Sequence, residues 1–240
     1  LENHDKPRSI DRFLMPEDQN RYSEKMLPVT NFFLPGIVFL YQGQEIGMTN
    51  CIRNDISEYD DISTKDQYQV AIDAGCSREE ALRCCYENSR DNARTPMQWT
   101  DNENAGFTDG TPWLAMNPNY RQINVREQEA RTDSVLAYYR RLVHLRKADA
   151  YRETFTYGIF EPAYQEMADV FAYYRVSGES GQRILVAANF GTDAVSLPLA
   201  YPCRQVLLSN LRAESAVETA CEKANALTLE SCEVAVIELG

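Results

Sequence analysis

Long apolar runs are missing from this sequence of 240 residues. A transmembrane helix needs at least about 18 consecutive apolar residues, and no stretch approaches that length, so we predict no membrane span. Positive charge is scarce too, because 24 Lys and Arg stand against 36 Asp and Glu, for a net charge of −12. A surface this acidic repels phosphate backbones and anionic lipids. We therefore expect neither nucleic acid nor membrane among the partners.

Paired cysteine motifs are also lacking. The seven cysteines are odd in number and none stands in a Cys-x-x-Cys spacing, so zinc-ribbon and thioredoxin-like sites lack support. Free thiols and an acidic surface favour a cytoplasmic protein. No internal repeat is evident, and 11 Gly and 10 Pro are ordinary for a globular chain. The sequence opens with Leu1 and carries no signal peptide, so we expect it to start inside a longer polypeptide.

The first part of the chain alternates between helix and strand patterns. Residues 21–33 carry apolar side chains at three- and four-residue spacing and predict an amphipathic helix, with Pro28 interrupting it. After Pro35-Gly36, the continuous apolar run 37–41 is typical of a strand buried on both faces of a parallel sheet. A helix, a short turn and a buried strand together form one unit of an α/β architecture.

Two further helices are predicted downstream of this unit. One covers about 67–87 and is broken near Gly75, with Ser77 and Glu80 as a capping box. The other covers 132–148, and basic residues crowd its end. Long polar loops lie between them, and loops of that length in a compact domain usually have a function or are disordered. The aromatic side chains in these loops favour order.

The pattern changes to a period of two from about residue 151. Short runs with this period, separated by turn clusters, predict strands in series and therefore an antiparallel sandwich. The runs are 154–160, 169–176, 183–190, 204–210, 226–230 and 232–239. We predict two domains, an α/β part over 1–150 and an all-β part over 151–240.

Three polar motifs could carry chemistry. Asn3-His4-Asp5 taken alone favours a polar turn capped by Asp5, although at the end of a strand its side chains could reach a ligand. The segment 42–47 follows the apolar run, where α/β proteins place their sites, but an ordinary turn explains it equally well. Residues 89–99 combine two Arg, Asp, Asn and Trp, which suit a sugar. A surface loop with a local Arg–Asp pair is the even alternative.

Taken in order, these motifs resemble the α-glucosidases of the α-amylase superfamily, of the bacterial oligo-1,6-glucosidase and dextran glucosidase type. Trehalose-6-phosphate hydrolases are also similar. The resemblance covers nearly the whole chain and weakens after about residue 195. It rests on Glu-Asn-His-Asp-Lys-Pro-Arg at 2–8, Tyr-Gln-Gly-Gln-Glu-Ile-Gly-Met-Thr-Asn at 41–50, Ser-Arg-Asp-Asn-Ala-Arg-Thr-Pro-Met-Gln-Trp at 89–99, Asn-Ala-Gly-Phe at 104–107 and Asn-Pro-Asn-Tyr at 117–120.

The resemblance implies the fold class: α/β plus all-β, namely the C-terminal part of a TIM (β/α)8 barrel followed by a small antiparallel β-sandwich. Residues 1–5 then end the seventh barrel strand, 37–41 form the eighth, and 132–148 form the last barrel helix. Because a whole barrel needs roughly 250 residues, the first six strands are expected upstream of residue 1. The family's nucleophilic Asp and acid/base Glu are expected there too, so this chain by itself is predicted to be inactive.

The resemblance also implies roles for individual residues. Asp5 matches the third catalytic carboxylate, which binds the sugar and stabilises the transition state. His4 matches a hydrogen-bond donor to the same sugar, and Arg90 matches the arginine that grips the terminal glucose. Ser63, in Asp61-Ile62-Ser63, stands where close relatives usually carry a Glu that contacts the acceptor sugar. A hydroxyl is shorter and uncharged, which leaves the choice between α-1,6 and α-1,4 bonds open.

The expected function is a retaining, exo-acting α-glucosidase that hydrolyses short oligosaccharides such as isomaltose in carbohydrate catabolism. The alternatives are a trehalose-6-phosphate hydrolase and a non-catalytic member of the superfamily that acts as an interaction subunit. We expect an oligosaccharide as the partner and a monomer when the protein has its full length. No metal site and no cofactor are expected in these residues, and a calcium site could lie upstream.

Overall fold

The computed structural model describes residues 1–240, and the chain divides into two compact units. One comprises Leu1–Gln19 and Phe39–Ala137 and is called the loop unit below. The other comprises Asn20–Val38 and Tyr138–Gly240 and is called the sheet unit. None of the helices combines the length and the apolar character that crossing a bilayer requires.

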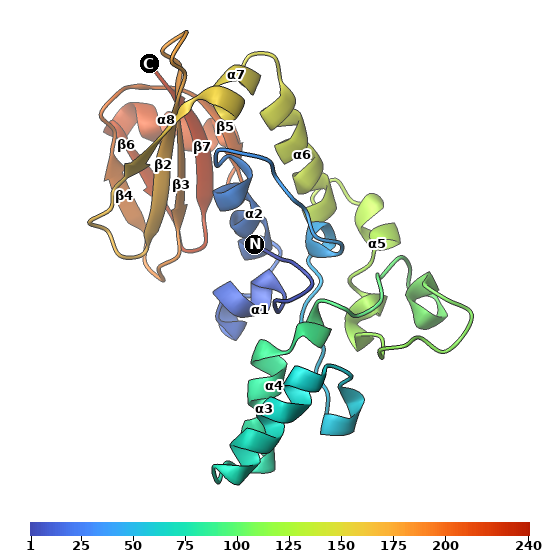
Figure 1. The fold of residues 1–240 in the computed structure, drawn as a ribbon. Helices are drawn as coiled ribbons and strands as arrows, with labels where there is room; N and C mark the ends of the chain where they lie inside the picture. Colours follow the sequence, from blue (N-terminus) through green and yellow to red (C-terminus); the bar gives the residue numbers. More distant parts are fainter. The chain divides into compact units, whose positions relative to one another are not determined.

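The sheet unit is built on antiparallel strands (Figure 1). A five-stranded sheet has the order β1-β2-β3-β7-β5, and β4 pairs with β6 in a second, two-stranded sheet. At the centre, Val186 of β3 lies opposite Tyr173 of β2 and Val236 of β7. The antiparallel arrangement predicted from the period of two is confirmed. The strands are β1 (Ile159–Ala163), β2 (Val170–Val176), β3 (Arg183–Asn189), β4 (Val195–Pro198), β5 (Cys203–Ser209), β6 (Ala226–Leu229) and β7 (Val234–Leu239).

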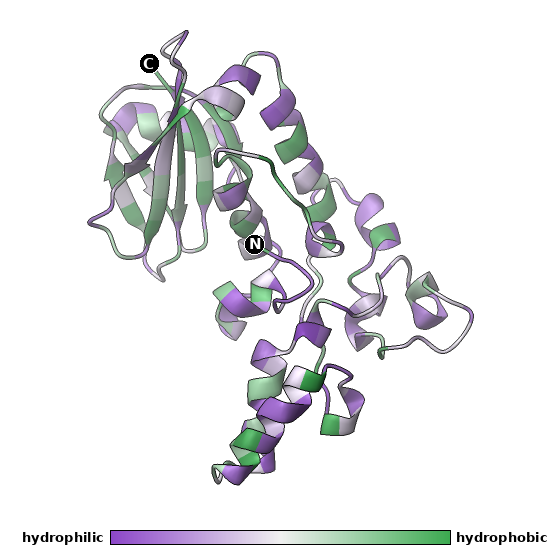
Figure 2. Cartoon of the chain, in the orientation of Figure 1, coloured by the Kyte–Doolittle hydropathy of each residue, from purple (hydrophilic) through white to green (hydrophobic).

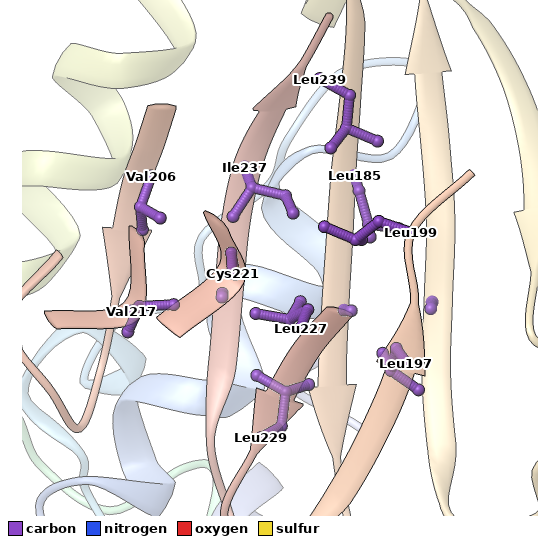
Figure 3. Close-up of a cluster of buried hydrophobic side chains, with 13 residues drawn as sticks. Leu185, Leu197, Leu199, Val206, Val217, Cys221, Leu227, Leu229, Ile237 and Leu239 are labelled. Atoms are coloured by element: carbon purple, nitrogen blue, oxygen red, sulfur yellow. The ribbon is translucent and has the colours of Figure 1, made fainter. Parts of the chain in front are cut away.

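Alternate side chains of the large sheet form the main apolar core (Figure 3). Leu185 of β3 and Ile237 of β7 face the small sheet, where Leu197 and Leu227 are fully buried. Helix α8 (Glu214–Ala224) closes the same side with Val217 and Cys221. Burying a Leu or Ile side chain contributes about 2 kcal/mol, so this cluster holds the unit together.

Helix α2 (Ser23–Phe32) covers the opposite face of the sheet. The Tyr173 hydroxyl donates to the Thr30 carbonyl at 3.2 Å, and the Arg175 guanidinium donates to the Phe33 carbonyl at 2.6 Å. Burial lowers the pKa of Arg175, whose guanidinium donates hydrogen bonds to two backbone carbonyls. The helix predicted over 21–33 is confirmed, and it tolerates Pro28 because packing compensates for the lost hydrogen bond.

Three helices of the chain's second half bear on the predictions. Helix α6 (Val135–Lys147) confirms the helix expected over 132–148. Helix α7 (Arg152–Tyr157) stands where a strand was expected to begin, so the run 154–160 is only a strand from Ile159 onwards. Helix α8 and strand β4 were not expected at all. Their short apolar patterns fit either structure, and packing against the sheet decides between them.

The loop unit has little regular structure besides one helical hairpin, α3 with α4. Its helices are α1 (Ser9–Phe13), α3 (Ile62–Asp73), α4 (Arg78–Asn88) and α5 (Val125–Glu129), with 3₁₀ turns at Pro16–Asp18, Gln44–Ile46, Ile56–Glu58, Arg90–Asn92, Glu103–Gly106 and Pro118–Arg121. The predicted break near Gly75 and the Ser77–Glu80 capping box are both present. Figure 2 shows mainly hydrophilic colours along α3 and α4 and hydrophobic ones along the sheet strands.

The buried strand predicted over 37–41 is wrong. These residues form no strand, and Ile37 and Phe39 are 85% and 78% exposed. A parallel strand is stable only when neighbouring strands pair with its backbone and helices cover its faces. No strand of residues 1–240 pairs with this segment, and the apolar side chains stay in solvent.

Candidate functional site

A tight turn in the loop unit carries His4 and Asp5. The amide oxygen of Asn3 accepts the Asp5 N–H at 2.8 Å, and the Lys6 N–H donates to the Asn3 carbonyl. Both site side chains face solvent, with 71% of His4 and 48% of Asp5 exposed. The imidazole Nε2 lies 3.1 Å from Asp5 Oδ2. The turn therefore presents a carboxylate and an imidazole side by side to a ligand.

The base of this turn is a buried ion pair. Arg8 is fully buried and its Nη1 lies 3.0 Å from Glu2 Oε2. The second oxygen of Glu2 accepts from the backbone and hydroxyl of Ser9. Arg8 Nη1 also donates to the Gln42 carbonyl at 2.8 Å, and its Nε donates to the Asn92 carbonyl at 3.3 Å. Because every oxygen and most donors are satisfied, the pair tolerates burial and fixes the turn against two other motifs.

Gly43 is what lets Arg8 come this close. Its backbone has φ +88°, and a Cβ there would lie 2.3 Å from Met48 Sδ and 3.2 Å from Arg8 Nη1. A side chain at this position is excluded by both the backbone and the space. The segment 42–47 therefore supports the turn through its contacts with the Arg8 side chain.

Two arginines from one short segment converge on Asp5. Arg94 donates from Nη2 to Asp5 Oδ1 at 3.1 Å and from Nε to the His4 carbonyl at 3.0 Å. Arg90 Nη1 lies 3.6 Å from the same Oδ1, an ion-pair distance beyond a hydrogen bond. The 3₁₀ turn Arg90–Asn92 brings the two side chains, four positions apart, to the same side. The predicted residues Asp5, His4 and Arg90 thus come together.

Arg90 is held by a second carboxylate, Asp61. Its Nε donates to Asp61 Oδ2 at 3.2 Å and its Nη2 donates to Oδ1, which makes a two-pronged contact. The guanidinium hydrogen bond lowers the pKa of Asp61, and Asp61 in turn raises the pKa of Arg90. Two acids and two arginines form the cluster of Asp5, Asp61, Arg90 and Arg94, so its formal charges cancel.

Ser63 lies apart from that cluster. It stands in the first turn of α3, two residues after Asp61, and its hydroxyl accepts from the Gln67 amide at 3.2 Å. Sequence reasoning assigned no role to Arg94 or Asp61, although both stand in quoted motifs. The spacing of Arg90 and Arg94 was the available signal for the first, since residues four apart share one face of a helical turn. Asp61 had no comparable signal.

The arrangement suits an uncharged polyol. Guanidinium groups and carboxylates are planar and present paired donors and acceptors, which match neighbouring hydroxyls of a sugar ring. The balanced charge of the cluster favours a neutral ligand over a phosphate. Among residues 1–240, no group of three or more His, Cys, Asp and Glu side chains is placed to hold a metal ion.

Comparisons with known proteins gave matches to a family model, to relatives in sequence and to solved structures. The family model described as alpha amylase, catalytic domain, matches residues 1–157. An oligo-1,6-glucosidase of Parageobacillus thermoglucosidasius is 38% identical over 91% of this chain and 39% of its own length. A trehalose-6-phosphate hydrolase of Bacillus subtilis is 37% identical over 80% of this chain. The crystal structure of an isomaltulose synthase from Klebsiella sp. LX3 matches 100% of the chain and 42% of its own, with 33% identity and a TM-score of 0.86.

These matches bear on both the fold and the length. The expected fold class, the C-terminal part of the barrel followed by an antiparallel β domain, is confirmed by the solved structures that cover the chain. The chain spans about 39% of the length of the first relative it matches. The division into domains at residue 150 stays a prediction.

Proposed function

The chain belongs to the α-amylase family, and from that premise we propose that its protein hydrolyses α-glucosidic bonds of short oligosaccharides such as isomaltose. The observation that carries the proposal is the cluster at Asp5, where an exposed carboxylate stands beside His4, Arg90 and Arg94. The names of its relatives support the α-1,6 linkage, and α-1,4 bonds remain the second choice.

In the proposed mechanism Asp5 accepts hydrogen bonds from hydroxyls of the glucose ring at the bond that breaks. Its negative charge is worth most as positive charge develops on the ring, so it favours the transition state over the bound substrate. His4 donates to the same sugar. Arg90 is 39% exposed, and its Nη1 lies 3.6 Å from Asp5, beyond hydrogen-bond distance. This nitrogen is therefore available to donate to the terminal glucose. A grip on the chain end makes the cleavage exo.

A retaining mechanism needs two more carboxylates, a nucleophile and an acid/base about 5 Å apart. Asp61 is not proposed for either role, because Arg90 holds both of its oxygens. We propose that the two groups come from a part of the domain that the relatives have in addition to the segment matched here. A polypeptide of residues 1–240 alone is therefore expected to release no glucose from p-nitrophenyl α-glucoside. Turnover by it would overturn this assignment.

The proposal is tested with the longest polypeptide that the gene encodes. Glucose release is measured from isomaltose, maltose and trehalose 6-phosphate, and the anomer of the first product is read by proton NMR. We expect the highest kcat/KM on isomaltose and release of α-glucose, the signature of retention. Absence of turnover on all three sugars would contradict the proposal. β-Glucose as the first product would contradict retention alone.

A trehalose-6-phosphate hydrolase is the second candidate, because one relative carries that name at 37% identity. A dianionic phosphate needs surplus positive charge, whereas the cluster at Asp5 balances two arginines with two acids. We rank this candidate lower for that reason. A non-catalytic interaction subunit ranks lower still, because such a protein has no need for Asp5 and Arg90 together. Preference for the phosphorylated sugar in the assay above would reverse the order.

We further propose a cytoplasmic monomer that needs no cofactor. No disulfide joins any of the seven cysteines of residues 1–240, which fits a reducing compartment. Sedimentation of the full-length protein tests the oligomeric state, and activity after dialysis against EDTA tests the metal requirement. Loss of activity that calcium restores would place a metal site in the protein.

A further inference from the structure

We propose that Asp61 is a positioning residue that sets the pose of Arg90 toward Asp5 and the sugar. The inference deepens the proposed function and rests on it. Nothing in the predicted roles of His4, Asp5 and Arg90 requires Asp61, and its place in the structure is what singles it out.

The contact between the two side chains leaves Arg90 little freedom. Nε and Nη2 of Arg90 are the two donors on one edge of the guanidinium, and both point at Asp61. Such a fork fixes direction as well as distance, because the two bonds lie in one plane. The remaining nitrogen, Nη1, is thereby directed at Asp5, 3.6 Å away. Asp61 thus decides which donor of Arg90 is presented to the site.

Asp61 gives up its usual structural task to make this contact. It is the N-cap residue of α3, where an Asp side chain normally accepts a backbone N–H of the first helical turn. No such bond is formed here. Its side chain is only 4% exposed, and its oxygens accept from Arg90 and from the Thr64 hydroxyl. The Asp61 carboxylate therefore binds Arg90 instead of capping its own helix.

Hydrogen bonds from neighbouring residues fix the position of Asp61. Asp91, fully buried, accepts the backbone N–H groups of Asp60 at 2.7 Å and Asp61 at 3.0 Å. The Thr64 hydroxyl lies 2.8 Å from Asp61 Oδ2 and 2.9 Å from the Ser89 hydroxyl. Asp91 and Ser89 flank Arg90 in sequence. The segment that carries the arginine therefore also holds the acid that aims it.

Without the charge on Asp61, Arg90 has a clear alternative. Asp5 is then its nearest carboxylate, and a direct fork between Arg90 and Asp5 would occupy the oxygens that the sugar needs. Both effects reduce catalysis: the terminal glucose loses a grip present before and during the reaction, and Asp5 loses its pose for the transition state. We expect KM to rise and kcat to fall together.

The test is Asp61→Asn in the full-length enzyme, with Asp66→Asn as the matched control. Asp66 is an exposed acid on the same helix, so its replacement removes the same charge from the same element. We expect kcat/KM for isomaltose to fall about 100-fold in Asp61→Asn, because misplacing a site group by about an ångström costs that much. Asp66→Asn is expected to stay within about twofold of wild type.

A double-mutant cycle separates positioning from folding. If Asp61 acts through Arg90, the Asp61→Asn change should lower kcat/KM by less than about threefold in an Arg90→Lys background. Equal losses in both backgrounds would overturn the proposal. So would an Asp61→Asn enzyme whose kcat/KM matches that of Asp66→Asn. An inactive wild type, in contrast, would count against the proposed function itself.

Thr64→Val decides the matter if Asp61→Asn does not fold. This change keeps the shape and removes one hydrogen bond from the Asp61 carboxylate. We expect it to lower kcat/KM about fivefold, the equivalent of one hydrogen bond of about 1 kcal/mol. Wild-type kinetics for a folded Thr64→Val enzyme would contradict the role assigned to Asp61.

Discussion

Different interactions stabilise the sheet unit and the loop unit internally. The main core of the sheet unit is a cluster of buried apolar side chains centred on Leu185 and Ile237. The loop unit has a much smaller apolar cluster around Ile46, Met48 and Met97. Its motifs are joined instead by polar side chains, such as Arg8, that bond to backbone carbonyls.

This contrast indicates where a polar site can be built. Apolar packing is indifferent to direction, whereas a hydrogen bond fixes the angle between two groups as well as their distance. The cluster of Asp5, Asp61, Arg90 and Arg94 needs such angles. It lies in the unit whose backbone is already arranged by hydrogen bonds, so positioning the site and holding the unit together are one task. The sheet unit combines its strand ladders with a larger cluster of buried apolar side chains.

The largest expected effect is on catalysis in the loop unit. Asp5→Asn keeps the shape of the side chain and removes its charge, and we expect kcat to fall about 1000-fold. The melting temperature should change little, because the Asp5 side chain is about half exposed. Steady-state kinetics and a thermal melt of the full-length enzyme measure the two quantities. An unchanged kcat would remove Asp5 from the mechanism.

A change in the sheet unit should show the reverse behaviour. Leu185 is fully buried against the small sheet, and Leu185→Ala is expected to lower the free energy of unfolding by about 3 kcal/mol. The kcat measured well below the melting temperature should remain close to wild type. Urea unfolding followed by circular dichroism gives the first number. A large loss of kcat in a still-folded Leu185→Ala enzyme would break the contrast between the units.

Arg94 offers a smaller effect within the site. Arg94→Gln removes the charge beside Asp5 and the two-point tie to the turn, so kcat/KM should fall about 30-fold. Arg83→Gln is the matched control, since Arg83 is exposed on α4 and 70% of its side chain faces solvent. The expectation is contradicted if both variants keep wild-type kinetics on isomaltose.

The smallest effect concerns stability in the loop unit. Ser77 caps α4, and its hydroxyl accepts the Glu80 N–H at 3.2 Å. Ser77→Ala should cost about 1 kcal/mol, as losses of a helix cap usually do, with no change in kcat. Hydrogen exchange of the α4 amides reports this loss locally. Ser77→Gly should cost less than Ser77→Ala, and the opposite order would argue against capping as the cause.

The sheet unit was the easier one to predict. Period-two runs such as 183–190 and 232–239 describe β3 and β7 closely, because each strand is long and buried. The failures are short elements whose partners decide their structure. Helix α7 forms where the first part of a strand was predicted. Residues 37–41 form no strand because no neighbouring strand pairs with them. Local pattern cannot report on a missing partner.

The site was predictable only from its motifs. Asn3-His4-Asp5 alone favoured a polar turn, and a turn is what the structure shows. The neighbourhood of Asp5 and Arg90 followed from the resemblance, since no periodicity relates residues 85 positions apart. Asp61 escaped because no local pattern singled it out, since the nearest predicted helix began at about residue 67. Its actual partner, Arg90, is 29 positions away, and only the folded chain reveals it.

The contact between α2 and the sheet has a consequence for how the protein is made. Thr30 and its partner Tyr173 are 143 positions apart, and Tyr22 accepts from Asn210, 188 positions later. At a synthesis rate of about 5–20 residues per second, α2 is made about 7–28 s before β2. During that time its side chains Met26 and Val29, buried in the folded chain, lack the sheet against which α2 packs. This helix is therefore the segment of the nascent chain that we expect a chaperone to hold.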